Sequence, residues 1–219
     1  MLNNKDLLSI NELSKSEIIS IINNANSYYH DNKISSKKKV LINFTQINLF
    51  FENSTRTQVS FEIAGTLLGA NVVNFPFNNS SQSKGETLLD TATNLNAMSP
   101  NLLVVRHPDS GAVQLLAEKV KCSVVNAGDG NHEHPTQALL DALTIRNRKK
   151  KIQGLKIAIC GDILHSRVAR SNIYLLTMLG AEVNIVAPSN LMPKEIEKFG
   201  VNTFTDMKKG LKDCDIVMM

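Results

Sequence analysis

The segment Ser54-Thr55-Arg56-Thr57 combines the side chains best suited to hold an anion. Three hydroxyls and a guanidinium stand directly before a helical pattern that carries Val59 and Ile63. A helix start offers unpaired N–H groups and the positive end of the helix dipole, and an arginine can bind a phosphate through two parallel hydrogen bonds. The segment therefore predicts a phosphate-binding loop. The alternative is an ordinary Ser/Thr N-cap with a surface arginine.

Further polar residues follow two other predicted strands. Arg106 comes directly after the apolar run 102–105, and His134 and Gln137 come after the apolar run 123–126. In open parallel sheets, ligands bind outside the carboxyl ends of the strands, so these residues are expected at one sheet edge. Arg106 adds a second cation for a phosphate, whereas His134 and Gln137 could face the carbonyl and amide ends of a ligand.

Metal and cofactor chemistry is poorly supported. His132 and His134 are only two positions apart, without HExxH spacing and without a Cys pair, so we expect no metal. The stretch 161–166 lacks the glycines that a pyrophosphate requires, and neither a Walker A loop nor a GxSxG elbow occurs. The sequence predicts a site without metal and without cofactor.

Apolar runs alternate with helical patterns along the chain, which is typical of a parallel α/β fold covered on both faces. Ser14 and Glu17 form a capping box at the start of the first helix. Strands are expected at 40–44, 71–75, 102–105, 123–126, 156–160, 182–187 and 215–219, and later helices at 59–69, 86–98, 113–120, 135–143, 167–179 and 193–199.

The polar run 146–151 is the best candidate for a hinge. We therefore expect two doubly wound parallel-sheet domains, at 1–145 and 155–219, joined by a linker at 146–154. The second domain is incomplete on this reading, because the strand at 215–219 has no covering helix. We expect the chain to be a fragment or a naturally truncated protein.

The composition of the 219 residues, 42% hydrophobic with a net charge of +4, is that of a globular protein. The basic runs 37–39 and 146–151 contain no aromatics to stack on bases, so no nucleic-acid partner is expected. No signal peptide or apolar run of membrane-spanning length occurs, which favours a cytoplasmic protein without a membrane partner. Cys122, Cys160 and Cys214 are widely spaced and are expected to be buried free thiols.

Five segments together carry a resemblance to a known family: FFENSTRTQVSFE, SSQSKGETLLDT, VVRHPDSG, NAGDGNHEHPTQALLDALTI and GDILHSRVARSN. In this order and spacing the chain resembles the carbamoyltransferases from its first helix to Met219. The STRT and HPTQ motifs are similar to those of the whole family, which includes the ornithine enzymes. The KGE loop and the SRVARSN segment resemble the aspartate branch.

The resemblance implies a reaction between carbamoyl phosphate and L-aspartate. The amino group attacks the carbonyl carbon, giving N-carbamoyl-L-aspartate and phosphate, a step of pyrimidine synthesis. It also implies the carbamoyltransferase fold and a homotrimer whose subunits share active sites, possibly with regulatory chains. Two alternatives stay open: another amine acceptor such as ornithine, and a truncated homologue that binds ligand without catalysis.

For carbamoyl phosphate, the resemblance implies that residues 54–57 hold the phosphate. Arg106 is expected to bridge the phosphate and the carbonyl oxygen. His134 and Thr55 would polarise that oxygen, and Gln137 would contact the carbamoyl amide. The residues expected to take part in catalysis are Thr55, Arg56, Arg106 and His134.

For aspartate, the resemblance implies that Arg167 holds a carboxylate. Ser80 and Lys84 match a loop that enters the site of a neighbouring subunit. The alternatives are a solvated lysine at position 84 and a surface arginine at 167 that pairs with Asp162. The family continues beyond Met219 with further aspartate-binding residues, so we expect a complete donor half and a partial acceptor half.

Overall fold

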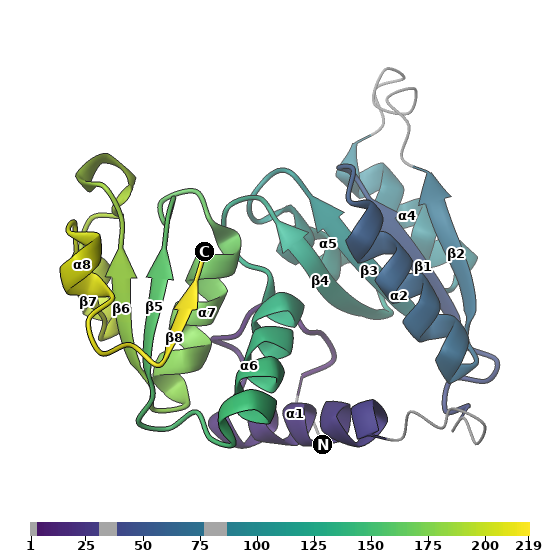
Figure 1. The fold of residues 1–219 in the computed structure, drawn as a ribbon. Coiled ribbons are helices and arrows are strands. Elements are labelled where there is room, and N and C mark those ends of the chain that lie inside the picture. Colours follow the sequence, from purple (N-terminus) through teal and green to yellow (C-terminus); the bar gives the residue numbers. More distant parts are fainter. Residues whose placement is uncertain (1–3, 31–38, 77–86) are drawn as a thin grey trace. The chain divides into compact units, whose positions relative to one another are not determined.

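The computed structural model describes residues 4–30, 39–76 and 87–219 (Figure 1). The chain divides into two compact units, one of residues 1–8 and 31–132 and the other of residues 9–30 and 133–219. Each unit has its own four-stranded parallel sheet. The chain is therefore a two-sheet parallel α/β protein, as the sequence predicts. Ser80 and Lys84 lie outside the described residues.

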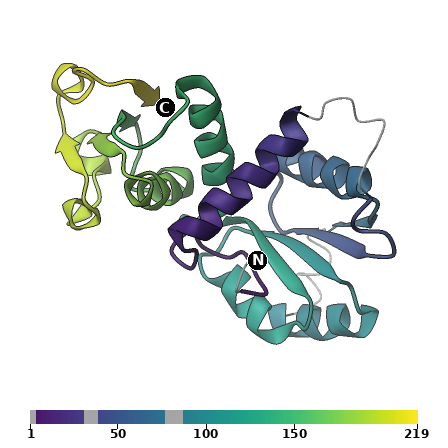
Figure 2. The ribbon, with the colours of Figure 1, turned by 90° about the horizontal axis from the view of Figure 1, so that it is seen from below.

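The first unit contains a sheet in the order β2-β1-β3-β4, with all neighbouring strands parallel. Helix α2 lies on one face of this sheet, and α4 and α5 lie on the other (Figures 1 and 2). The elements are β1 (Thr45–Phe50), α2 (Thr55–Leu68), β2 (Asn71–Pro76), α4 (Leu88–Met98), β3 (Leu102–His107), α5 (Ala112–Lys119) and β4 (Ser123–Asp129).

The core of this unit is formed by apolar side chains on both faces of the sheet. Ile47 and Leu49 share one buried cluster with Leu95 and Leu116 of the helices α4 and α5. Phe50 belongs to a second cluster, with Val104 and Ala127. Successive side chains of a strand point to opposite faces, so the central strand β1 supplies apolar contacts to both helical layers.

The second unit contains a sheet in the order β7-β6-β5-β8, again with parallel neighbours. Ser14 and Glu17 exchange hydrogen bonds at the start of α1, which confirms the predicted capping box. The elements are α1 (Lys15–His30), α6 (Pro135–Lys149), β5 (Lys156–Cys160), α7 (Arg167–Met178), β6 (Glu182–Val186), η2 (Ser189–Leu191), η3 (Ile196–Phe199), β7 (Asn202–Phe204), α8 (Met207–Gly210) and β8 (Ile216–Met218).

The strand predicted at 40–44 is wrong, because the strand β1 occupies Thr45–Phe50. The apolar side chains of Val40 and Ile42 are each 56% exposed, in a turn. Within β1, Gln46 and Asn48 are buried, and the Gln46 amide donates to the Asn48 side chain at 2.8 Å. Because these two polar side chains interrupt the apolar residues of β1, the sequence has no continuous apolar run there, and the strand was not predicted at this position.

Other boundaries also differ from the predictions. The first part of the predicted linker, Arg146–Lys149, is the last turn of α6. The predicted helix at 193–199 is reduced to the short 3-10 turn Ile196–Phe199, and β7 and α8 were not predicted. The two compact units differ from the two predicted domains, whose boundaries were at 145 and 155, because α1 and α6 both belong to the second unit. Those limits stay a prediction.

No helix among the described residues combines the length and the apolar character needed to cross a membrane.

The three cysteines are free, as predicted, but each is partly exposed rather than buried. Burial still raises the pKa of the Cys122 thiol.

Candidate active site

The predicted phosphate loop lies at the start of α2, directly after β1. Ser54 is the N-cap residue and makes no side-chain cap bond, because its hydroxyl donates instead to Thr57 Oγ1 at 3.0 Å. The backbone N–H groups of Thr55, Arg56 and Thr57 have no acceptor among the described residues. The helix start therefore presents three unpaired donors beside the exposed Arg56, an arrangement that favours an anion.

Arg106 lies at the end of β3, at the same sheet edge as the loop. Phe50 and Arg106 are paired across the strands, and the N–H of Phe51 donates to the Arg106 carbonyl at 2.9 Å. The Arg106 guanidinium donates from Nε to Glu52 Oε1 at 2.6 Å and from Nη1 to the Ala127 carbonyl at 3.3 Å. The structure thus holds the Arg106 side chain at Glu52, just before the loop 54–57, and their joint binding of a phosphate stays a prediction.

His107, the last residue of β3, is a buried histidine beside this loop. Its ring lies 4.6 Å from that of Phe51, and its Nδ1 accepts the N–H of Asp109 at 3.0 Å. Burial lowers the pKa of His107, against the opposing charges of Asp109, Asp129 and Glu52. The folded protein therefore favours the neutral imidazole.

This pKa shift predicts a loss of stability in mild acid. The folded state binds fewer protons than the unfolded state once the pH falls below the ordinary histidine pKa of about 6.5. We expect the melting temperature to fall between about pH 7 and pH 5.5, and to fall less steeply in His107→Gln. Glutamine keeps an acceptor for the Asp109 N–H. The exposed His165→Gln is the control, and equal slopes in the wild type and His107→Gln would contradict the prediction.

His134 is the N-cap residue of α6, in the second unit. It is 7% exposed, and its N–H donates to Ser171 Oγ at 2.8 Å. The Ser171 hydroxyl in turn donates to Glu133 Oε2 at 2.9 Å, and Glu133 is completely buried. Its carboxylate also accepts the Ser9 hydroxyl at 2.6 Å and the Ile10 N–H at 3.1 Å. Three donors from distant segments therefore fix the residue that precedes His134.

Gln137 lies one turn into α6 and lines a cavity of about 640 Å³. Its Nε2 donates to Asp141 Oδ1 at 2.9 Å, and Asn172 donates to the other Asp141 oxygen at 2.8 Å. Burial raises the pKa of Asp141, while the bonds from Asn172 and Gln137 oppose that shift. Because Asp141 holds the amide nitrogen, the Gln137 carbonyl oxygen is left to accept from a ligand.

Arg167 begins α7, after the loop 161–166 whose residues line the same cavity. Asp162 belongs to the same loop. Its carboxylate accepts from His165 Nδ1 at 2.9 Å, and this bond lowers the pKa of Asp162. Within the described part of the chain, no group of three His, Cys, Asp or Glu side chains is arranged to hold a metal ion.

Sequence reasoning missed Glu52, Glu133 and Asp141, which hold Arg106, the backbone before His134, and Gln137 respectively. Glu52 and Glu133 each stand within two residues of a predicted site residue, and Asp141 stands one helical turn after Gln137. The spacing of Gln137 and Asp141 is a usable signal, because a carboxylate four positions along a helix lies on the same face.

Two family profiles match the chain. Residues 5–147 match "Aspartate/ornithine carbamoyltransferase, carbamoyl-P binding domain", and residues 153–219 match "Aspartate/ornithine carbamoyltransferase, Asp/Orn binding domain". With its two parallel sheets and these two matches, the chain belongs to the aspartate/ornithine carbamoyltransferase family.

Among its relatives are two proteins named aspartate carbamoyltransferase catalytic subunit. The one from Pelagibacter ubique (strain HTCC1062) is 68% identical over 98% of this chain and 69% of its own length. The one from Parvibaculum lavamentivorans is 61% identical over 98% of this chain and 66% of its own length. The chain therefore spans about two thirds of these relatives.

Solved structures of the family have the same fold. The aspartate transcarbamoylase of Trypanosoma cruzi in complex with carbamoyl phosphate and aspartate has a TM-score of 0.88 and 33% identity, covering 97% of this chain and 71% of that one. The catalytic subunit of M. jannaschii aspartate transcarbamoylase has a TM-score of 0.87 and 33% identity, covering 98% of this chain and 72% of that one.

Proposed function

We propose that the protein is the catalytic chain of an aspartate carbamoyltransferase. It transfers the carbamoyl group of carbamoyl phosphate to the amino group of L-aspartate, releasing phosphate, in pyrimidine synthesis. The observation that carries the proposal is the loop 54–57, whose unpaired helix N–H groups follow Glu52, the residue that holds the Arg106 guanidinium. The identity of 68% to a catalytic subunit of the aspartate branch supports the choice of acceptor.

The chemistry needs positive charge and hydrogen-bond donors. As the amine attacks, negative charge gathers on the carbonyl oxygen and on the departing phosphate. Donors that are already oriented stabilise such charge without rearranging in the transition state. In the proposed assignment, residues 54–57 hold the phosphate and Arg106 serves both the phosphate and the carbonyl oxygen. Glu52 and the Ala127 carbonyl keep the Arg106 guanidinium oriented before substrate arrives.

The remaining assignments follow the family motifs. His134 and Thr55 are proposed to polarise the carbonyl oxygen, and Gln137 to accept a hydrogen bond from the carbamoyl amide. Arg167 is proposed to hold an aspartate carboxylate, together with Lys84 of a neighbouring subunit. The role of Gln137 fits its geometry, because Asp141 already binds its amide nitrogen.

Replacing Asp141 tests the role of Gln137. In Asp141→Ala the Gln137 amide loses its partner, so we expect the KM for carbamoyl phosphate to rise about 3- to 10-fold, the value of one hydrogen bond. Asp141→Asn is the matched control. The buried Oδ1 of Asn172 has no partner among the described residues, so Asn172 can turn its amide and accept from the new asparagine, giving up its bond to the Val168 carbonyl. Equal KM values in Asp141→Ala and the wild type would contradict the role.

Subunit association is proposed from the surface of α2. Val59 and Ile63 lie one turn apart on this helix and are 43% and 53% exposed. The sequence pattern predicts this stripe, but the first unit does not bury it. An exposed apolar stripe on a helix is typical of a contact between proteins. The stripe supports association between subunits, and the homotrimer with shared sites is proposed from the family resemblance. Sedimentation velocity of the protein, expressed with any continuation of its reading frame, would test it.

The acceptor is tested by product formation. The same full reading frame is assayed with carbamoyl phosphate and either L-aspartate or L-ornithine. We expect N-carbamoyl-L-aspartate and stoichiometric phosphate with aspartate, and neither product above background with ornithine. A preference for ornithine would overturn the acceptor. Calorimetric binding of carbamoyl phosphate without release of phosphate would favour the non-catalytic alternative.

A further inference from the structure

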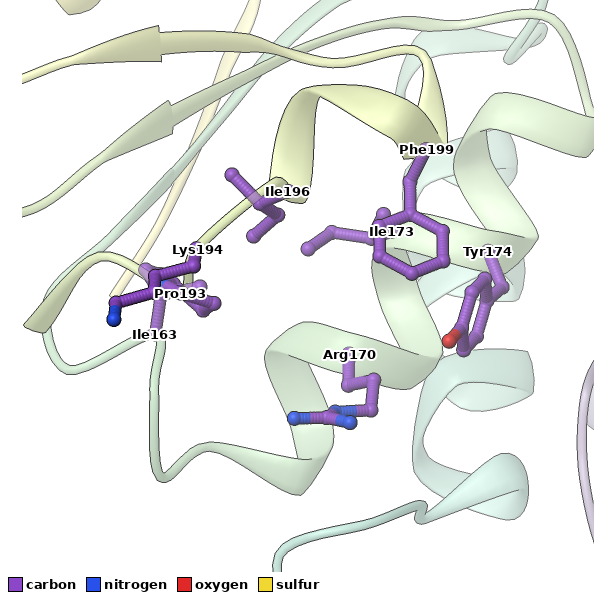
Figure 3. Close-up of a pocket in the computed structure, with 8 residues that line it drawn as sticks. All are labelled: Ile163, Arg170, Ile173, Tyr174, Pro193, Lys194, Ile196 and Phe199. Carbon is purple, nitrogen blue, oxygen red and sulfur yellow. The ribbon is translucent and has the colours of Figure 1, made fainter.

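A second cavity, of about 250 Å³, lies in the second unit between α7 and the segment 193–199 (Figure 3). Its interior is apolar. Ile163, Ile173 and Ile196 line it, and each is 3% exposed. These three side chains come from separate segments, so the cavity is formed by the tertiary fold rather than by one loop.

An aromatic pair forms one side of the cavity. The rings of Tyr174 and Phe199 lie 5.2 Å apart and meet edge to face at 79°. Figure 3 shows both rings beside Ile173. Phe199 is 46% exposed, so an aromatic surface is left partly in water at the edge of the cavity. Such a surface can stack on the flat or apolar part of a small ligand.

Two cations complete the lining, Arg170 and Lys194, and no acidic side chain lines the cavity. Neither side chain forms an ion pair or hydrogen bond with the described residues. The nearby Glu195 pairs instead with Lys198, at 2.8 Å. In Figure 3 the guanidinium of Arg170 extends toward the side of the cavity where Lys194 and Ile163 lie, away from Phe199. The cavity therefore has an aromatic side and a cationic side.

None of the residues assigned to carbamoyl phosphate or aspartate lines this cavity. Arg167 and Arg170 both belong to the first turns of α7, but only Arg170 lines it. Gln137 lines the larger cavity of about 640 Å³. The small cavity is thus distinct from the larger one, although Ile163 lines both.

We infer that the small cavity is a binding site for a small organic anion with an apolar body, of the class of single-ring or branched-chain carboxylates. The carboxylate binds the Arg170 guanidinium, and the exposed Lys194 side chain, whose amino group points away from Arg170 in Figure 3, turns toward it. The apolar body fills the space lined by the isoleucines. The volume of about 250 Å³ restricts the ligand to about one ring, since pockets for larger molecules start near 300 Å³. Two cations without partners favour an anion over a neutral molecule of equal shape.

Phenylacetate is a suitable probe, and phenylacetamide is its neutral counterpart. Titrations are followed by methyl NMR of the protein labelled at isoleucine, in saturating N-carbamoyl-L-aspartate and phosphate, the two products of the proposed reaction, which occupy the active site without being consumed. We expect phenylacetate to shift the methyl signals of Ile173 and Ile196, which line the small cavity but not the larger one, and to leave that of Ile47 unchanged. Phenylacetamide is expected to bind at least about tenfold more weakly, because two cations contribute about threefold each.

Two variants test the cations. Arg170→Gln and Lys194→Gln are each expected to raise the Kd for phenylacetate about threefold, and together about tenfold. Lys198→Gln is the matched control, because that lysine pairs with Glu195 and does not line the cavity. Lys194 is exposed, so its substitution leaves the fold intact.

Three results would overturn the inference: equal binding of phenylacetate and phenylacetamide, no effect of Lys194→Gln, or loss of the shifts when both reaction products are present. The last would mean that the probe occupies the substrate site. The absence of any shift in the wild type, as expected if other protein covers the cavity, would overturn it as well. None of these results bears on carbamoyl transfer itself.

Discussion

Replacing Arg106 by alanine is expected to lower the turnover number by at least about 10²–10³-fold, the usual loss when one oriented donor is removed from a developing oxyanion. Arg106 is 14% exposed at its side chain and is held by Glu52 and the Ala127 carbonyl. Its guanidinium therefore acts from a fixed position. A mobile lysine in its place would supply a charge but not the planar pair of donors, so Arg106→Lys should recover little activity.

The measurement is the steady-state rate of phosphate release with carbamoyl phosphate and aspartate, on the full reading frame. Arg56→Ala is expected to lose a similar factor, because Arg56 stands at the helix start beside the unpaired N–H groups. Arg148→Ala is the control, since Arg148 is an exposed arginine in the last turn of α6. Wild-type rates in both Arg56→Ala and Arg106→Ala would refute the assignment of the phosphate site.

Replacing Glu133 by alanine is expected to lower the free energy of unfolding by about 2–4 kcal/mol, because it leaves buried donors without acceptors. The Ser9 hydroxyl, the Ile10 N–H and the Ser171 hydroxyl all lose their partner. The loss extends to His134, whose N–H is held by Ser171. A fall in turnover beyond the loss of folded protein is therefore expected as well.

The substitution Glu133→Gln removes the negative charge but keeps one oxygen that accepts hydrogen bonds. The glutamine carbonyl oxygen can take the place of Oε2 and accept from both Ile10 and Ser171, while its nitrogen donates to Ser9 Oγ. We expect a loss of less than about 1 kcal/mol. Both variants are compared by urea unfolding at pH 7. Equal losses in Glu133→Ala and Glu133→Gln would show that the hydrogen-bond geometry is not what Glu133 contributes.

The position of the proposed phosphate half at the sheet edge was predictable because its residues lie at or shortly after the ends of parallel strands. Ser54–Thr57 and Arg106 lie where parallel strands end, and the geometry of a parallel sheet places such positions at one edge. The prediction that Arg106 lies at the sheet edge did not depend on exact strand boundaries. β3 continues through Arg106 and His107 instead of ending at Val105, and Arg106 is still at the edge.

The supporting residues were not predictable in the same way. Glu133 accepts from Ser9 and Ser171, and nothing in local sequence indicates that these hydroxyls meet it. β1 was misplaced for a related reason, since the buried amides of Gln46 and Asn48 depend on partners elsewhere in the fold. Periodicity reports which face is apolar, but it carries no information on which polar groups satisfy one another in the interior.

The hydrogen bonds of Glu133 have a consequence for the order of folding. They join positions that are 124 and 38 residues apart in the chain. Contacts of such long range form late, because the intervening chain must first lose its freedom. During synthesis, Ser9 is among the first residues made, yet its partner emerges more than a hundred residues later. The segment before α1 can therefore form its hydrogen bonds only after α6 and α7 have been made. The backbone at His134 reaches its final geometry only when Ser9 and Ser171 have both bound Glu133.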